Sequence, residues 1–515
     1  MRIIRFAISL MTLLCADSLS GQQSGNFFNR IPLSSSEKIL NLKTVDSHPN
    51  IQPLAIGLES RFDLHPDSIL HAPIAKKFIN IAPIVSLGTG FQFAQEQKAL
   101  ANGIVGLNAQ LNNSKWSAQI GYSAVGGLLP SYLENYVDSL LVMPGVGFAS
   151  NRGSNAPLAH YTYGHVSYSN GKHFHFELGK GKHFWGDGYR SMILSDNASS
   201  YPYARITTKV WKLKYTNLWT QMRDLTGSKN RTNARIKYTA MHALSFNAGR
   251  KFNFSIYEMV VWQDRDTMSR RTLDINYLNP IIFYRPVEYS VGSPDNVILA
   301  TSMKYRPKSW LQLYGQFVLD EFNLKQFQGN KKWWANKLGG QFGVKMFDVV
   351  IPNLNIQTEV NVARPFTYTH GSPIQSWTHL NQSLAHPMGC NFIEWVSFIR
   401  YQKKEWTFLE QFSWAAFGRD RDVNNDGIID NLGGNILRSY KDPFEQYGHS
   451  ILQGDKSNFF YHAFTVSRAL PKFESFEIFL NHTLRYDQNE TRRNLDHFIM
   501  VGVRVIGLLQ MATDY

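Results

Sequence analysis

Polar and apolar residues alternate along most of the chain from Ile79 onward. The stretch NLNIQTEVNV places polar residues on one face and mostly apolar residues on the other: Asn355, Gln357, Glu359 and Asn361 against Ile356, Thr358, Val360 and Val362. The stretches LQLYGQFVLD and FEIFLNHTLRY repeat this pattern. A period of two residues is typical of β-strands with two different faces, so we expect an all-β chain.

The links between these segments fall into two length classes that alternate along the chain. Short links are predicted at 112–115, 169–172, 247–251, 306–309, 401–405 and 470–474. Long links are predicted at 125–159, 181–203, 263–295, 321–337, 366–390 and 418–457. Counting the segments between them gives about 18 strands, with short turns at one end and long loops at the other, as in outer-membrane barrels.

A transmembrane β-barrel satisfies this pattern physically, because only a closed sheet leaves no unpaired backbone groups facing lipid. Tryptophans occur in or at the ends of the predicted strands, where an aromatic girdle would lie: Trp116, Trp211, Trp219, Trp262, Trp310, Trp395 and Trp406. With both chain ends in the periplasm, the short turns would be periplasmic and the long loops extracellular. A soluble β-sandwich or propeller is the alternative, although no blade-length repeat is visible.

The N-terminus predicts export. Arg2 and Arg5 precede an apolar run and then small residues, which is the layout of a signal peptide over 1–21. Cys15 is preceded by Leu14, which disfavours the alternative of a lipoprotein anchor. We therefore expect a signal peptide at 1–21, a periplasmic segment or plug at 22–78, the barrel at 79–507 and a C-terminal tail at 508–515.

Composition narrows the class of protein further. Cys390 is the only cysteine after the predicted signal peptide, so we expect no disulfide within the mature chain. No later stretch is long and apolar enough for a membrane helix. The net charge is +14, which suits acidic glycans or lipopolysaccharide. Export and the lack of nucleic-acid-binding motifs argue against a nucleic-acid partner.

Residues 179–206, GKGKHFWGDGYRSMILSDNASSYPYARI, form the most unusual stretch. Its glycines do not match a phosphate-binding loop, because no Lys-Ser or Lys-Thr pair and no helix follow. His173, His175 and His183 are better explained as polar residues facing a lumen than as metal ligands. No arrangement typical of a catalytic site stands out, and we expect no enzymatic activity.

The same stretch, together with LNPIIFYRPVEYSVGSPDNVILA at 278–300, resembles the Wzi-like capsule-assembly proteins of Bacteroidota, a group that includes relatives of the gliding-motility surface protein RemB. The resemblance spans residues 75–507. It implies an outer-membrane barrel that binds surface polysaccharide and helps to assemble the capsule. The periplasmic helical bundle of enterobacterial members has no clear counterpart in residues 22–78.

Both motifs fall in long links, so we expect them on the extracellular side, either folded into the lumen or forming a ligand surface. The candidate glycan-binding residues combine flat rings with charges: Lys180, Lys182, Trp185, Asp187, Tyr189, Arg190, Tyr284, Arg285, Glu288 and Tyr289. The alternative is that they only lock the barrel mouth, with Asp187 and Glu288 pairing with the cations of the motifs.

A calcium site is the one metal site that the sequence predicts. DVNNDGIID has oxygen ligands at every second position and a glycine at the turn, and its candidate ligands are Asp422, Asn424, Asp426, Ile428 and Asp430. Position twelve is Gly433, so Asp442 or Glu445 would have to complete the site. A solvated turn is the alternative.

Three functions remain open at this stage. The first is a non-enzymatic barrel for assembly or attachment of a surface polysaccharide, with outer-membrane lipid, lipopolysaccharide and an acidic polysaccharide as partners. The second is a component of the gliding or secretion apparatus that binds other cell-surface proteins. The third is a diffusion channel, which requires an open lumen.

Overall fold

The fold is known from a computed structural model, which describes residues 33, 51–52, 78–94, 97–113, 115–150, 156–226, 233–265, 271, 274–280, 295–321, 331–470, 473–489, 491–505 and 514. The predicted signal peptide lies outside these residues, as do most of 22–78 and all of the tail except Asp514. No helix in the described ranges is long and apolar enough to cross a membrane.

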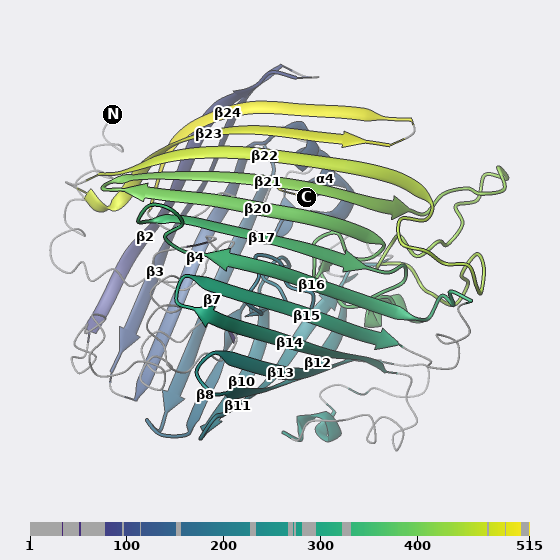
Figure 1. The fold of residues 1–515 in the computed structure, drawn as a ribbon, viewed down its shortest axis with the longest axis horizontal. Coiled ribbons are helices and arrows are strands. Elements are labelled where there is room, and N and C mark those ends of the chain that lie inside the picture. Colours follow the sequence, from purple (N-terminus) through teal and green to yellow (C-terminus); the bar gives the residue numbers. More distant parts are fainter. Residues whose placement is uncertain are drawn as a thin grey trace.

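Among the described residues, eighteen antiparallel strands form the wall of a closed barrel (Figure 1). They are β2 (Phe78–Gln92), β3 (Lys98–Asn112), β4 (Trp116–Leu128), β7 (Leu158–Ser169), β8 (Phe174–Gly181), β10 (Tyr201–Val210), β11 (Leu213–Asp224), β12 (Arg235–Ala248), β13 (Phe252–Gln263), β14 (Asn296–Lys308), β15 (Leu311–Glu321), β16 (Lys337–Met346), β17 (Leu354–Ala363), β20 (Phe392–Lys403), β21 (Trp406–Arg419), β22 (Asp455–Leu470), β23 (Phe473–Gln488) and β24 (Arg493–Val505).

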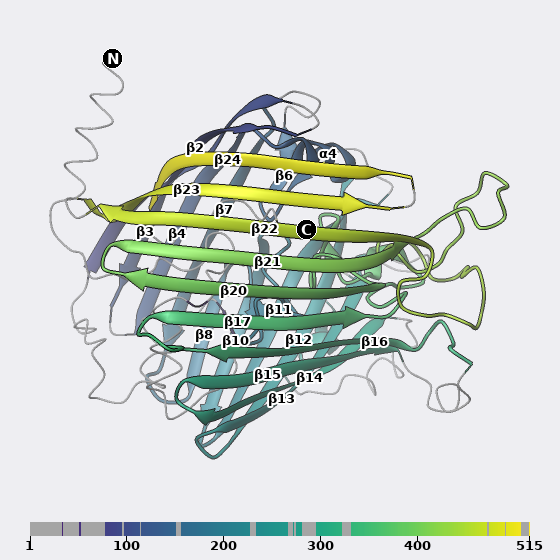
Figure 2. The ribbon, with the colours of Figure 1, turned by 45° about the horizontal axis from the view of Figure 1, so that its top comes forward.

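The barrel closes where the first wall strand pairs with the last. β2 and β24 lie side by side, with Ser86 opposite Arg504 and Gln92 opposite Phe498 (Figure 2). Every other wall strand pairs with its neighbour along the chain. The predicted fold class is therefore confirmed, and so is the alternation of short turns at one end with mostly long loops at the other.

The faces of the strands follow the predicted alternation. The polar face of β17 is buried towards the lumen, whereas Val360 on its other face is exposed. Val501 of β24 is exposed and Arg504 is buried, which is the same alternation. Exposed apolar side chains on the outer face are expected for a barrel whose outer surface contacts lipid.

Two of the seven predicted girdle tryptophans do not lie at an exposed girdle. Trp219 and Trp262 are buried on the outer wall, where they cluster with Tyr277 of the short helix η2 (Ile275–Leu278). The indole Nε1 of Trp219 donates to the Tyr277 carbonyl at 2.8 Å. The short helix η2 thus covers part of the outer wall, an arrangement that strand periodicity alone does not predict.

Besides η2, seven shorter elements in the described residues lie in the long loops. They are α4 (Ser131–Leu140), β5 (Val142–Met143), β6 (Gly147–Ser150), β9 (Phe184–Trp185), η3 (Pro373–Gln375), β18 (Thr378–His379) and β19 (Gln382–Ser383). Leu133 and Val137 of α4 pack in one apolar cluster with Ile84, Ile104 and Val125. The remaining short strand, β1 (Ile51–Gln52), pairs with β9, so this part of the N-terminal segment meets the loop that follows β8.

Candidate functional site

Two long loops meet inside the barrel and form what we call the plug: residues 182–200, between β8 and β10, and residues 364–391, between β17 and β20. Ser195 N donates to the Leu384 carbonyl at 2.6 Å, and the indole Nε1 of Trp377 donates to the Ile193 carbonyl at 2.8 Å. The apolar side chains of both loops share one cluster with lumen-facing residues of β11 to β15. The plug is therefore packed against that wall as a core would be.

The glycines of the first loop serve close packing. Gly186 has φ +143°, and a Cβ atom there would lie 2.2 Å from Nε2 of Gln316 on β15. A Cβ on Gly188 would lie 2.7 Å from the Arg190 carbonyl oxygen. Gln316 in turn donates to the Trp185 carbonyl at 2.9 Å. These contacts explain the glycine content without a phosphate.

Carboxylates from the next part of the wall, on β17 and β20, hold the tip of the first loop. The backbone amides of Tyr189 and Arg190 donate to the two carboxylate oxygens of Glu359 on β17, at 2.7 and 2.8 Å. The Arg190 guanidinium pairs with Glu394 on β20 at 3.0 Å. His386, from the second loop, hydrogen-bonds the same Glu394 carboxylate at 2.6 Å. One buried guanidinium thus joins the plug to the wall.

The C-terminal tail contributes to this group through Asp514. Its carboxylate lies 3.1 Å from the Arg190 guanidinium and accepts hydrogen bonds from the Tyr189 hydroxyl at 2.7 Å and from Gln411 of β21 at 2.6 Å. Burial lowers the pKa of the Arg190 guanidinium, but Asp514 and Glu394 more than offset it and hold that pKa well above its ordinary value. Arg190 is therefore charged, and the tail residue Asp514 is part of the plug.

The other residues predicted from this motif have separate surroundings. Asp187 pairs with Lys304 of β14 at 2.9 Å, and so with a wall residue instead of a cation of the motif. Lys182 is buried and donates to the Asp196 carbonyl at 3.0 Å; burial lowers the pKa of its amine to about 8, although Asp196 opposes the shift. Lys180 is exposed on the outer wall and donates to the Thr162 hydroxyl at 2.5 Å.

The arrangement decides which of these side chains a ligand can reach. Trp185 is 0% exposed, and Asp187 and Arg190 are buried in ion pairs, so none offers a free surface to a sugar ring. Tyr189 is half-buried. Tyr284, Arg285, Glu288 and Tyr289 lie outside the described residues. Of the two predicted roles for residues 179–203, the structure places Trp185, Asp187 and Arg190 in a constriction folded into the lumen.

The histidines occupy different places. His175 faces the lumen and lies 3.3 Å from Glu177, and His183 is buried against Tyr203. His173, predicted to face the lumen, instead lies exposed in the turn before β8, where its ring contacts the Lys209 carbonyl at 3.0 Å. Within the described part of the chain, no group of three or more His, Cys, Asp or Glu side chains is placed to hold a metal ion.

The predicted calcium loop is closed by its own backbone. Asp422 accepts hydrogen bonds from the amides of Asp426 at 3.2 Å and Gly427 at 2.7 Å. Asp426 accepts from the Ile428 amide at 2.9 Å, and Asp430 from the Val423 amide at 2.8 Å. Gly427 has φ +84°, so the glycine allows the sharp turn. Calcium binding by these residues stays a prediction.

A second aromatic group, which the sequence did not single out, lies at the long-loop end. We call it the mouth cluster: Trp333, Trp334, Tyr440 and Tyr447. The rings of Trp333 and Trp334 are 5.9 Å apart, those of Trp334 and Tyr440 are 4.9 Å apart, and Lys331 lies 5.7 Å from the Tyr447 ring. Trp333 is half-buried and Tyr447 is exposed, so rings of this cluster reach solvent.

Hydrogen bonds position the mouth cluster. Both the backbone amide and the indole Nε1 of Trp334 donate to Gln446, to its carbonyl at 3.2 Å and to its side-chain oxygen at 3.0 Å. The adjacent residues WW at 333–334 were the only local signal in the sequence. Their partners come from a loop more than 100 residues later, so sequence alone gave no reason to group them.

The closed wall and the plugged lumen define the class of protein: an 18-stranded barrel of the kind found in outer-membrane proteins. No family model matches the chain, and no curated protein matches its sequence. Among solved structures, it is similar to Wzi of Escherichia coli, an outer-membrane protein involved in group 1 capsule assembly and described as a carbohydrate-binding β-barrel. That match has a TM-score of 0.56 and 12% identity, and covers 94% of this chain and 100% of that chain.

A weaker similarity extends to OccAB4 of Acinetobacter baumannii, with a TM-score of 0.43 and 8% identity over 83% of this chain and 97% of that chain. OccAB2 of the same organism gives 0.45 and 7% over 83% and 97%. At these identities the comparisons establish the fold alone.

Proposed function

We propose that this protein is a non-enzymatic outer-membrane barrel that binds an acidic surface polysaccharide and takes part in assembling or attaching it at the cell surface. The plug is the observation that carries the proposal, because buried ion pairs and an apolar core cross the lumen and disfavour an open diffusion channel. The similarity to a carbohydrate-binding barrel over nearly the whole chain supports the same function.

The mouth cluster is where we expect the polysaccharide to bind. Flat aromatic rings stack on sugar rings, and Lys331 and Lys332, both exposed, supply charge for carboxylate or phosphate groups. The buried motif residues Trp185, Asp187 and Arg190 would then act as the support of this surface. Tyr284, Arg285, Glu288 and Tyr289 remain candidates for direct contact.

The double variant Trp333→Ala/Tyr447→Ala tests this site. Each lost aromatic contact removes about 0.5–1.5 kcal/mol, so the affinity for purified capsular polysaccharide should fall roughly 5- to 150-fold when both are lost. The matched control is Trp211→Ala, an exposed tryptophan at the opposite end of the barrel. Affinity would be measured by surface-immobilised binding of the folded, heat-modifiable protein.

Two results would oppose the proposal. Equal affinity in the double variant and the wild type would remove the mouth cluster as the site, and no polysaccharide binding by the wild type would favour a protein-binding platform in a motility or secretion apparatus. A single-channel conductance as large as that of an open porin would favour a diffusion channel.

The proposed orientation has its own test. Cys390 is buried and free, so a cysteine introduced at 404 or 425 would be the reactive thiol on intact cells. With long loops outside, a membrane-impermeant maleimide should label position 425 and leave position 404 unlabelled. The reverse pattern would invert the barrel.

A further inference from the structure

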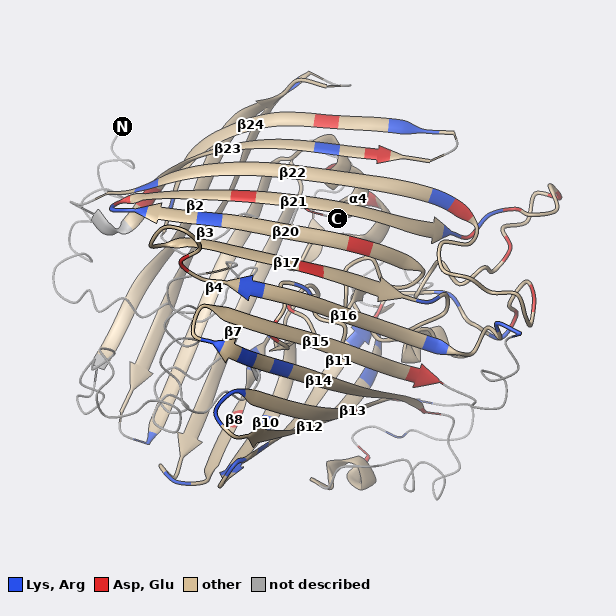
Figure 3. Cartoon of the chain, viewed as in Figure 1, with Lys and Arg blue, Asp and Glu red and all other residues tan. Residues whose placement is uncertain are grey.

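Basic side chains gather at the short-turn end of the barrel, opposite the mouth cluster. In the described residues they lie in the turns or in the adjoining ends of the strands; the turn between β16 and β17 has none, and residues 471–472 of the turn between β22 and β23 are outside the described part (Figure 3). They are Lys115, Lys172, Lys209, Lys212, Arg250, Lys251, Lys308, Lys403, Lys404 and Arg468. The carboxylates in the same described turns are Asp348 and Glu405. We call this band the basic rim.

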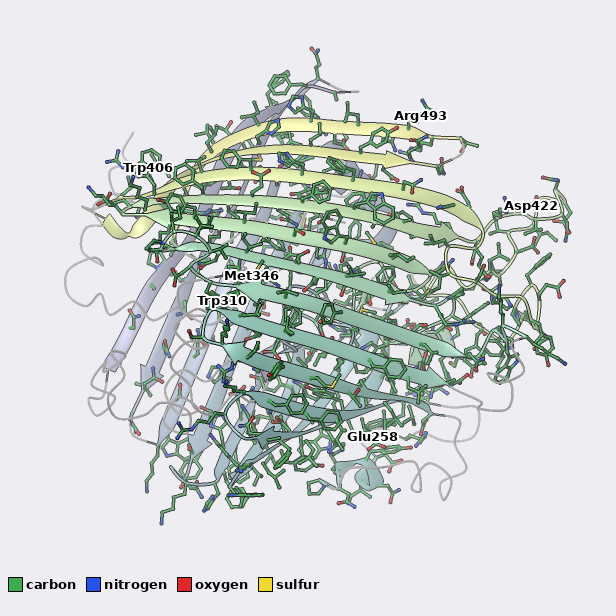
Figure 4. The ribbon with its side chains drawn as sticks, viewed as in Figure 1. Glu258, Trp310, Met346, Trp406, Asp422 and Arg493 are labelled. Carbon is green, nitrogen blue, oxygen red and sulfur yellow. The ribbon has the colours of Figure 1, made fainter. Side chains whose placement is uncertain are left out.

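The long-loop end is different because its charges are mixed. Arg438 pairs with Asp420 at 3.1 Å, and the loop between β21 and β22 has further acidic residues around Asp422 (Figure 4). The positive net charge of the chain therefore lies in good part at the end away from the proposed polysaccharide site. An anionic partner at the short-turn end would complement this charge.

Exposed tryptophans accompany the cations of the basic rim. Lys212 lies 5.1 Å from the ring of Trp211, Lys308 lies 5.7 Å from that of Trp310, and Arg468 lies 5.3 Å from that of Trp406. Figure 4 shows Trp310 and Trp406 at this end of the barrel. The pairs occur at three separate turns around the wall. Tryptophan rings prefer the boundary between hydrocarbon and headgroups, and long cationic side chains beside them reach into the headgroup layer.

Trp211 lies at the tip of one of these turns. It is the first residue of the two-residue turn between β10 and β11, in which Val210 lies opposite Leu213, and its φ of +54° is the backbone conformation that such hairpin turns use. Its ring lies 6.2 Å from that of Phe246, and the side chain is still 73% exposed. The turn therefore holds an exposed indole at the edge of the wall, the position that tryptophan takes at a membrane interface.

We propose that the basic rim binds the phosphate groups of anionic glycerophospholipids in the leaflet at the short-turn end of the barrel. The tryptophans fix the depth of the barrel at that interface, and the lysines and arginines pair with headgroup phosphates spaced around it. This binding is independent of polysaccharide binding at the mouth.

The test compares lipid preference in vesicles. The wild-type barrel is reconstituted into phosphatidylcholine containing rising fractions of brominated phosphatidylglycerol, and tryptophan quenching relative to brominated phosphatidylcholine gives the relative binding constant. The variant K308Q/K403Q/K404Q/R468Q neutralises four exposed rim cations. Its preference for phosphatidylglycerol should fall at least about fivefold, because each cation near an anionic surface adds to binding.

The matched control neutralises four exposed cations at the other end: R421Q/K441Q/K456Q/R493Q. It should keep the wild-type preference. If the fourfold rim variant fails to fold, K308Q/R468Q carries the test with a smaller expected loss. No preference in the wild type, an unchanged preference in a folded rim variant, or an equal loss in the control would overturn the proposal. So would displacement of phosphatidylglycerol by soluble polygalacturonate, which would assign the rim to a polysaccharide.

Discussion

The plug and the basic rim are built from the same kinds of residue, yet the two regions use them in opposite ways. In the plug, Trp185 is 0% exposed and Arg190 pairs with Glu394 and Asp514. At the rim, Trp211 is 73% exposed and carboxylates are few. Trp, Lys, Arg and Gly in one short stretch therefore do not indicate a role by themselves. Their role depends on whether the fold places carboxylates and apolar side chains in contact with these residues.

The largest expected effect comes from removing the central cation of the plug. Arg190→Ala leaves two buried carboxylates, on Glu394 and Asp514, without their partner, which should cost about 3–5 kcal/mol of the free energy of unfolding. Arg468→Ala, at the rim, should cost no more than about 0.5 kcal/mol. The midpoint of urea unfolding in detergent micelles measures both. Equal losses in the two variants would remove the distinction between the two regions.

The fold could be predicted from sequence because its signals are local. Alternation along each strand and the lengths of the links on either side are read within about ten residues, and each of the six predicted short links falls between two wall strands. The plug could not be predicted in the same way. The partners of Tyr189 and Arg190 are Glu359, Glu394 and Asp514, which lie 169 to 325 residues away along the chain.

Two further differences between the prediction and the structure also arise from contacts between residues that are far apart in the sequence. Alternation placed Glu359 on the polar face of its strand, but it could not tell a lumen-facing carboxylate in water from one that binds two plug amides. Trp219 and Trp262 have the right parity and position for a girdle, yet Tyr277 covers them from a loop. The period of a strand predicts which face of the sheet a side chain is on. The residues that the side chain contacts can come from a long loop, and the period does not predict them.

Asp514 provides a smaller and sharper test of the plug. Asp514→Asn keeps the size of the side chain but removes its charge from Arg190, so it should cost about 1.5–3 kcal/mol, the range for hydrogen bonds to charged groups. The control is Asp442→Asn, an exposed carboxylate in a mouth loop, which should be close to neutral.

Unfolding midpoints measure the loss, and single-channel conductance shows whether freeing the tail opens the lumen. A variant as stable as the wild type would mean that Asp514 merely rests beside Arg190, and that Glu394 alone neutralises it.

The smallest expected effect concerns the loop around Asp422. This loop is exposed, as the rim is, but its carboxylates accept hydrogen bonds, as those of the plug do. Its carboxylates already accept backbone amides within the loop, so calcium would have to use their remaining oxygen lone pairs together with the Ile428 carbonyl. We expect calcium to slow proteolysis within 418–457 severalfold. Millimolar calcium should be enough, because extracellular calcium modules bind the ion in about that range. Asp426→Ala should abolish this protection, and Glu405→Ala, a carboxylate of the rim, should leave it intact.

Magnesium should protect poorly, because it demands a tighter octahedral shell than a loop of this kind supplies. Protection that persists in Asp426→Ala, or that magnesium gives equally well, would show that the carboxylates only close the turn.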